Sequence, residues 1–83
     1  MTLKAKIKDL KSKIEALVIA IPREQEAYEF YTELKDLYDD KASKEMFEYL
    51  ARQELQHRIN LENILNGLEA QLKEIQKSGN KEE

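Results

Sequence analysis

The chain has 83 residues, of which 17 are acidic and 14 basic, so its formal net charge is −3. This length allows one domain at most, and the negative charge argues against a nucleic-acid-binding protein. The absence of cysteine from the chain excludes disulfides, thiolate zinc sites and iron–sulfur clusters within it. With two glycines, one proline and 37% charged residues, the composition is typical of long helices.

A first helix is predicted over residues 2–38, because apolar residues recur at alternating spacings of four and three. This stripe consists of Leu3, Ile7, Leu10, Ile14, Leu17 and Ile21. Pro22 interrupts the pattern, since a proline inside a helix removes one hydrogen bond and clashes with the carbonyl four residues earlier. We therefore expect either one helix with a kink near Pro22 or two helices that abut there.

The only continuous apolar run covers residues 16–21, which is far too short to span a membrane. It follows a basic start, as the apolar part of a signal peptide does. However, helical periodicity already precedes the run and no small-residue cleavage site follows it. We expect no membrane-spanning or targeting segment and place the protein in the cytoplasm.

Residues 38–41 are the predicted turn, with Asp40 as the N-cap of a second helix and Ser43 as the alternative. This second helix is expected over about 41–77, followed by a flexible polar tail at 78–83. Its stripe consists of Phe47, Leu50, Glu54, His57, Leu61, Ile64, Leu68 and Ile75. The expected fold is an all-α, antiparallel helical hairpin over residues 1–77. Two helices leave each apolar stripe half covered, so we expect the hairpin to dimerise into a four-helix bundle.

Three polar residues interrupt these apolar stripes at one level of the hairpin. At about 1.5 Å per residue, Glu24 lies about 23 Å from the turn, Glu54 about 22 Å and His57 about 26 Å. Two carboxylates that face one core repel each other and are costly to bury, and a bound cation removes both penalties. We therefore predict Glu24, Glu54 and His57 as metal ligands. Glu26 is the rival to Glu24 if Pro22 shifts the helical phase.

One hairpin supplies too few ligands for a closed site, whereas a two-fold dimer doubles them to four glutamates and two histidines. That set matches the di-metal carboxylate bundles, which use two glutamates and two Glu-x-x-His pairs. Tyr28 and Tyr31 follow Glu24 by one and two turns. They are candidates for hydrogen-bonding a ligand carboxylate, although such tyrosines are more often core residues. Without a metal, Glu54 and His57 would be a local ion pair, and Glu24 would be a polar residue that sets the register of the helices.

Two segments resemble one half of the rubrerythrin/ferritin-like superfamily. They are Ile21-Pro-Arg-Glu-Gln-Glu-Ala-Tyr-Glu-Phe-Tyr31 and Met46-Phe-Glu-Tyr-Leu-Ala-Arg-Gln-Glu-Leu-Gln-His57. In that family a glutamate precedes an Ala-x-x-Phe-Tyr helix, and Glu-x-x-His follows about thirty residues later. By this pattern the ligands fall on Glu24, Glu54 and His57. Full-length relatives hold two hairpins in one chain. A single hairpin is similar to the encapsulated ferritins, whose subunits dimerise around the metals.

The resemblance implies a di-iron protein in which two chains share the metals and ferrous iron reacts with O₂ or peroxide. It also implies a ferroxidase or peroxidase activity, a homodimer or higher homo-oligomer, and an electron donor or an encapsulating shell as partners. Manganese or zinc suits the same ligands, so a redox-silent metal-binding bundle is one alternative. A purely structural dimerisation module is another.

Some features depart from the family pattern. Gln53 stands where many relatives carry a second acidic residue before Glu-x-x-His, and Pro22 lies unusually close to the first ligand. Rubredoxin-like cysteine pairs are missing, and the C-terminal segment does not resemble an apolar cargo-loading peptide. These departures leave open which oxidant and which electron donor the protein would use.

Overall fold

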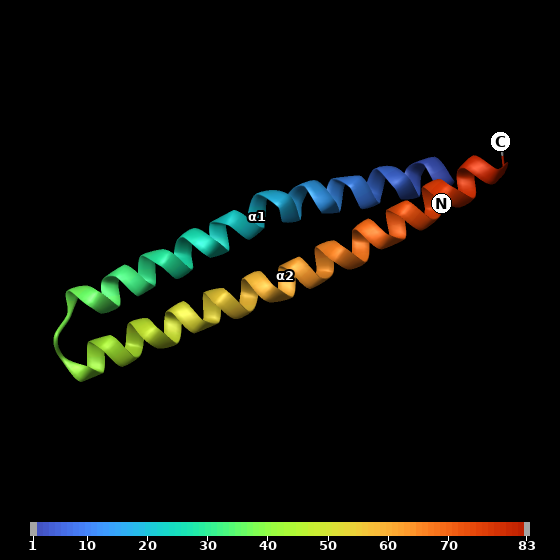
Figure 1. The fold of residues 1–83 in the computed structure, drawn as a ribbon. Coiled ribbons are helices and arrows are strands. Elements are labelled where there is room, and N and C mark those ends of the chain that lie inside the picture. The colour runs from blue at the N-terminus through green and yellow to red at the C-terminus, as the bar shows by residue number, and fades with distance from the viewer. Residues whose placement is uncertain (1, 83) are drawn as a thin grey trace.

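The computed structural model describes the backbone of residues 2–82 and the side chains of residues 2–78. It contains two long helices, α1 (Leu3–Leu37) and α2 (Lys41–Glu82), joined by residues 38–40. The helices lie antiparallel along one another, with the turn at one end and both termini at the other (Figure 1). The molecule is therefore a rod of 65 × 16 × 14 Å, and the predicted all-α hairpin is confirmed.

Both helices begin at capping residues that the sequence supplies. The Thr2 hydroxyl accepts a hydrogen bond of 3.1 Å from the Ala5 amide at the start of α1. The Asp40 carboxylate accepts one of 2.9 Å from the Ser43 amide at the start of α2. Such bonds satisfy amides that have no partner within the first turn of a helix. Asp40 is thus the N-cap, as predicted, and Ser43 is not.

The turn end is closed by contacts between the two helices. Lys44 Nζ donates a hydrogen bond of 3.2 Å to the Lys35 carbonyl, one of the last carbonyls of α1 that lack a helical partner. The Tyr38 and Phe47 rings stack with centroids 5.3 Å apart. These contacts hold the end of α1 against the first turns of α2. They therefore fix which residues of α1 lie beside which residues of α2.

The helix bounds differ from the sequence prediction in two places. α1 passes through Pro22 as one uninterrupted helix, so the alternative of two abutting helices is wrong. Its turns on either side pack against α2, which offsets the lost hydrogen bond. α2 runs to Glu82 rather than ending near residue 77, because Ser78 and the residues after it include no proline. The predicted tail at 78–83 lies mostly outside the residues whose side chains are described, and its flexibility stays a prediction.

Little of the apolar stripe is buried within one hairpin. Among the described residues only Leu10 and Ala51 are buried, at 4% and 6% exposure. Many large apolar side chains remain exposed, namely Leu3, Val18, Ile19, Phe30, Leu37, Tyr38, Met46, Tyr49, Ile59 and Ile64. In the part of the chain that the structure describes, no helix combines the length and apolar character needed to cross a membrane.

Candidate metal centre

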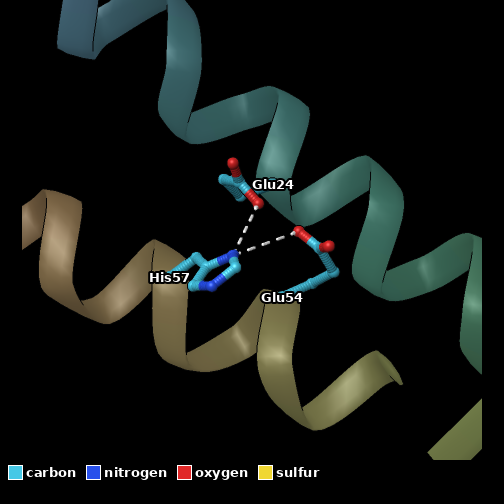
Figure 2. A group of neighbouring side chains, drawn as sticks. All are labelled: Glu24, Glu54 and His57. Carbon is cyan, nitrogen blue, oxygen red and sulfur yellow. Dashed lines mark ion pairs between the residues drawn. The ribbon is translucent and has the colours of Figure 1, made fainter. Parts of the chain in front are cut away.

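The three predicted ligands lie together near the middle of the hairpin. Glu24 projects from α1, while Glu54 and His57 project from successive turns of α2 toward it (Figure 2). Residues three positions apart share one face of a helix, which places Glu54 and His57 side by side. The levels predicted by counting helical rise from the turn are therefore confirmed.

The donor atoms are close enough to surround one cation. His57 Nδ1 lies 3.7 Å from Glu24 Oε2 and 3.8 Å from Glu54 Oε2 (Figure 2). One donor atom from each residue lies within 4.8 Å of the others. An ion with ligands at about 2.1 Å holds its donors roughly 3 to 4 Å apart. Small side-chain rotations thus suffice to bring all three donors onto a common metal, and the residues fit such a group.

The charges of this cluster also fit a cation. The neighbouring Glu24 carboxyl raises the pKa of Glu54, first through hydrogen bonding and then, after the effect of burial, through its negative charge. His57 acts in the opposite direction but does not cancel the rise. The folded hairpin therefore disfavours a full negative charge on Glu54 beside Glu24. A divalent cation between the carboxylates would remove this repulsion.

The cluster is half covered and opens on one side of the hairpin. The side chains of Glu24 and Glu54 are 27% and 22% exposed, because the helices shield them from two sides. His57 is 57% exposed, since it lies on the part of α2 that α1 does not cover. The position of His57 in the apolar stripe predicts a side chain covered by the other helix, and in the single hairpin that prediction is wrong. The imidazole faces both the carboxylates and open surface.

A hydrogen bond that the apolar pattern of the sequence does not predict lies beside the cluster. Arg58 Nη1 donates to Gln25 Oε1 at 2.8 Å and so connects α2 to α1. These residues directly follow His57 and Glu24 in the chain. Arg58 Nε also lies 3.4 Å from Glu62 Oε1. Neither Arg58 nor Gln25 interrupts the apolar pattern, so their contact can be found only from how the two helices are rotated relative to one another. The contact holds the turns that carry Glu24 and His57 at one level.

The remaining candidates lie near the cluster without a recorded bond to it. Tyr28 lines a groove between the helices with Ala51 and Leu55, and the Tyr31 ring packs against Phe30 with centroids 5.6 Å apart. Within residues 2–78, neither tyrosine hydroxyl has a hydrogen bond to a predicted ligand. Their role in hydrogen-bonding a ligand carboxylate stays a prediction. The rival ligand Glu26 is exposed and lies outside the cluster.

The family model of Rubrerythrin matches residues 15–83, which is well over half of the chain and contains all three predicted ligands. The chain belongs to the rubrerythrin family. Searches of curated proteins and of solved structures gave no match. Membership in this family supports a di-iron carboxylate assignment for the helical hairpin, and residues 3–14 of α1 precede the matched part.

Proposed function

We propose that this rubrerythrin-family hairpin is a di-iron carboxylate protein that oxidises ferrous iron with O₂ or peroxide. The observation that carries the proposal is the convergence of Glu24, Glu54 and His57 within 4.8 Å from two helices. Carboxylate and imidazole donors suit Fe(II) and Mn(II). Family membership favours iron among these metals.

The ligand count requires a second copy of the chain. One hairpin offers two carboxylates and one imidazole, which is half the ligand set of a di-metal carboxylate bundle. A homodimer contributes four glutamates, with a total charge of −4, and two divalent ions carry +4. The resulting neutral centre can be enclosed between the hairpins at much lower cost than four unpaired carboxylates. The exposed face of His57 is where the second copy would complete the site.

Each ligand has a distinct task in this arrangement. Glu24 and Glu54 would hold the ferrous ions through their carboxylates, and His57 would hold them through its imidazole. Ferrous iron supplies one electron per ion, so two ions reduce one hydrogen peroxide to two waters when two protons are taken up. Tyr28 is the nearer of the two tyrosines along α1 for orienting Glu24.

Iron analysis of matched variants tests this proposal. The parent protein, loaded anaerobically with Fe(II) and desalted, is expected to retain about one iron per chain. Glu54→Gln preserves size and helix propensity but removes the ligand charge, so it should retain less than about a tenth of that iron. Glu69→Gln, at an exposed position of the same helix, should retain all of it. Equal iron in the Glu54 and Glu69 variants would contradict the assignment.

Exposure of the loaded protein to O₂ or peroxide then tests the redox step. Oxidation of Fe(II), followed by the ultraviolet absorption of ferric iron, is expected in the parent and in Glu69→Gln only. A protein that binds zinc or manganese in place of iron would be a redox-silent bundle. A protein that binds none of these metals would be a structural dimerisation module, and either result would overturn the proposal.

A further inference from the structure

The hydrogen bond between Arg58 and Gln25 joins the two helices at the level of the ligands. Arg58 Nη1 donates to Gln25 Oε1 at 2.8 Å, and within residues 2–78 no other hydrogen bond runs between side chains of α1 and α2. Outside the ligand cluster, the ion pair between the helices, from Lys35 Nζ to Glu48 Oε2 at 3.7 Å, lies closer to the turn. The Arg58–Gln25 pair is therefore the polar contact best placed to act on the cluster.

The pair and the ligands occupy neighbouring positions on both helices. Gln25 follows Glu24 and Arg58 follows His57, and successive residues are about 100° apart around a helix. The His57 side chain is 57% exposed, whereas that of Arg58 is 32% exposed. The pair thus lies on a different side of the hairpin from the exposed imidazole, while its backbone belongs to the same two turns.

The pair forms only when the helices have one relative position. Counting helical rise from the turn puts Arg58 about 6 Å farther along the hairpin than Gln25. Side chains of a helix lean toward its N-terminus. Because α2 begins at the turn and α1 ends there, Arg58 leans toward the turn and Gln25 leans away from it. The two side chains close the gap between them, and a shift or rotation of either helix would break the contact.

Both members of the pair are also held from their own helices. Arg58 Nε is buried and lies 3.4 Å from Glu62 Oε1, one turn along α2. Gln25 Nε2 donates a hydrogen bond of 3.1 Å to Glu29 Oε1, one turn along α1. These contacts restrict the side-chain rotamers of Arg58 and Gln25. The hydrogen bond between them therefore connects the two backbones rather than two freely moving side chains.

The ligand cluster is sensitive to this restraint. A donor atom lies about 6 Å from the axis of its helix, so rotating α2 by about 20° moves the donors of Glu54 and His57 by about 2 Å. A metal site needs its ligands within about 0.5 Å of their working positions. Apolar packing restrains the rotation weakly, because among the described residues only Leu10 and Ala51 are buried.

We propose that Arg58 and Gln25 are positioning residues of the metal centre. Their hydrogen bond fixes the rotation of α2 relative to α1 and so sets the affinity and the coordination geometry of the bound ions. The proposal rests on the proposed function for the presence of a metal but not for its redox chemistry. It gives a role at the centre to two side chains that are not ligands.

Titration with Co(II) tests this role, because the visible absorption of Co(II) reports the number and arrangement of its ligands. Arg58→Met keeps the apolar stem and removes the donor, and Gln25→Leu removes the acceptor. Each should weaken Co(II) binding by about tenfold or more and change the absorption spectrum. Arg52→Met is the matched control, because Arg52 is 76% exposed and pairs only with Glu48 of its own helix. This variant should bind Co(II) as the parent does.

Exchanging the two side chains separates positioning from general stability. The double variant Gln25→Arg/Arg58→Gln can form the same hydrogen bond in the opposite direction and should recover the parent's affinity and spectrum. Gln25→Arg alone and Arg58→Gln alone should not. The metal-free single variants should unfold within a few degrees of the parent by circular dichroism, since one exposed hydrogen bond contributes little to the free energy of unfolding.

Each result supports or overturns the proposal. Weaker binding and an altered spectrum in the single variants, with recovery in the double variant, support it. Single variants that match Arg52→Met overturn it, as does a loss of affinity that the double variant does not restore. A parent that binds Co(II) but does not oxidise iron removes the redox function and leaves the positioning role. A parent that binds no Co(II) overturns both proposals, which the variants alone do not.

Discussion

At the scale of single residues, the hairpin brings two partly buried carboxylates together without a cationic side chain, among the described residues, to pair with them. Glu24 and Glu54 are about three-quarters covered and lie close to one another, and within residues 2–78 neither pairs with a lysine or arginine. Like charges at such positions destabilise a folded chain in the absence of a counter-ion. A cluster of this kind lowers the stability of the metal-free protein, because its carboxylates are placed to bind a cation and repel each other without one.

Replacing one of these carboxylates should therefore not destabilise the metal-free protein. We expect Glu54→Gln to unfold at the same temperature as the parent or at a higher one, measured by circular dichroism in the presence of a chelator. Leu10→Ala serves as the comparison, since emptying that buried position should cost about 2 to 5 kcal/mol. A loss of comparable size in Glu54→Gln would mean that Glu54 is a structural residue.

The sequence was sufficient to predict which side chains form this cluster. Glu24, Glu54 and His57 each occupy an apolar-stripe position, and the rise of a helix is constant enough to compare their levels over fifteen or so residues. The contact between Arg58 and Gln25 could not be predicted in this way, because both residues stand beside the stripe. The exposure of His57 was also missed, since it depends on the rotation of α2 about its axis relative to α1.

At the scale of helices, the N-cap of α2 links stability to pH. The Ser43 side chain and amide hold the pKa of Asp40 below its ordinary value of 3.8, because both donate to the ionised carboxylate. A lowered pKa stabilises the folded state above the unfolded-state pKa, and this contribution is lost as the pH falls through the lower, folded-state pKa. The stabilisation by this cap is therefore complete near neutral pH, begins to fall at about pH 4, and is lost as the pH falls through the lower pKa of the folded state.

The cap can be removed without touching the metal ligands. Asp40→Ala should lower the thermal midpoint by a few degrees at pH 7, because the Ser43 amide loses its acceptor. The difference from the parent should shrink as the pH is lowered below the pKa of the cap. Thermal unfolding of both proteins across this pH range measures the effect, and a difference that stays constant down to strongly acidic pH would rule out the ionised cap.

Pro22 shows where sequence rules and packing disagree. Its intrinsic effect predicts a break or kink, yet α1 continues through it, because turns on both sides are held against α2. The sequence alone does not reveal this balance, since it depends on contacts between the two helices, such as the hydrogen bond from Arg58 to Gln25, three residues after Pro22. The extent of α2 beyond residue 77 was missed for a similar reason, because propensity and polarity alone place the boundary too early.

Replacing the proline should release the energetic cost that this packing offsets. We expect Pro22→Ala to raise the free energy of unfolding of the metal-free protein by about 1 to 3 kcal/mol, measured by urea denaturation. Iron content should be unchanged, because Glu24 keeps its place on a continuous helix. A destabilised variant would show instead that Pro22 is required for the course of α1.

At the scale of the whole molecule, the hairpin is a rod whose uncovered face and ligand cluster coincide. A single copy buries almost none of its side chains fully and presents half of a di-metal ligand set. The short length of the chain predicts association, and the proposed second copy would complete the ligand set. Folding, dimerisation and metal binding are expected to be coupled.

Native mass spectrometry of the iron-loaded protein is the most direct test of a metal centre shared between two chains. We expect a dimer that carries two iron ions, and a Glu54→Gln protein that carries none. The Glu69→Gln protein should match the parent. Iron bound to isolated monomers, or a dimer that retains two ions after Glu54→Gln, would contradict a centre built by Glu24, Glu54 and His57 of both copies.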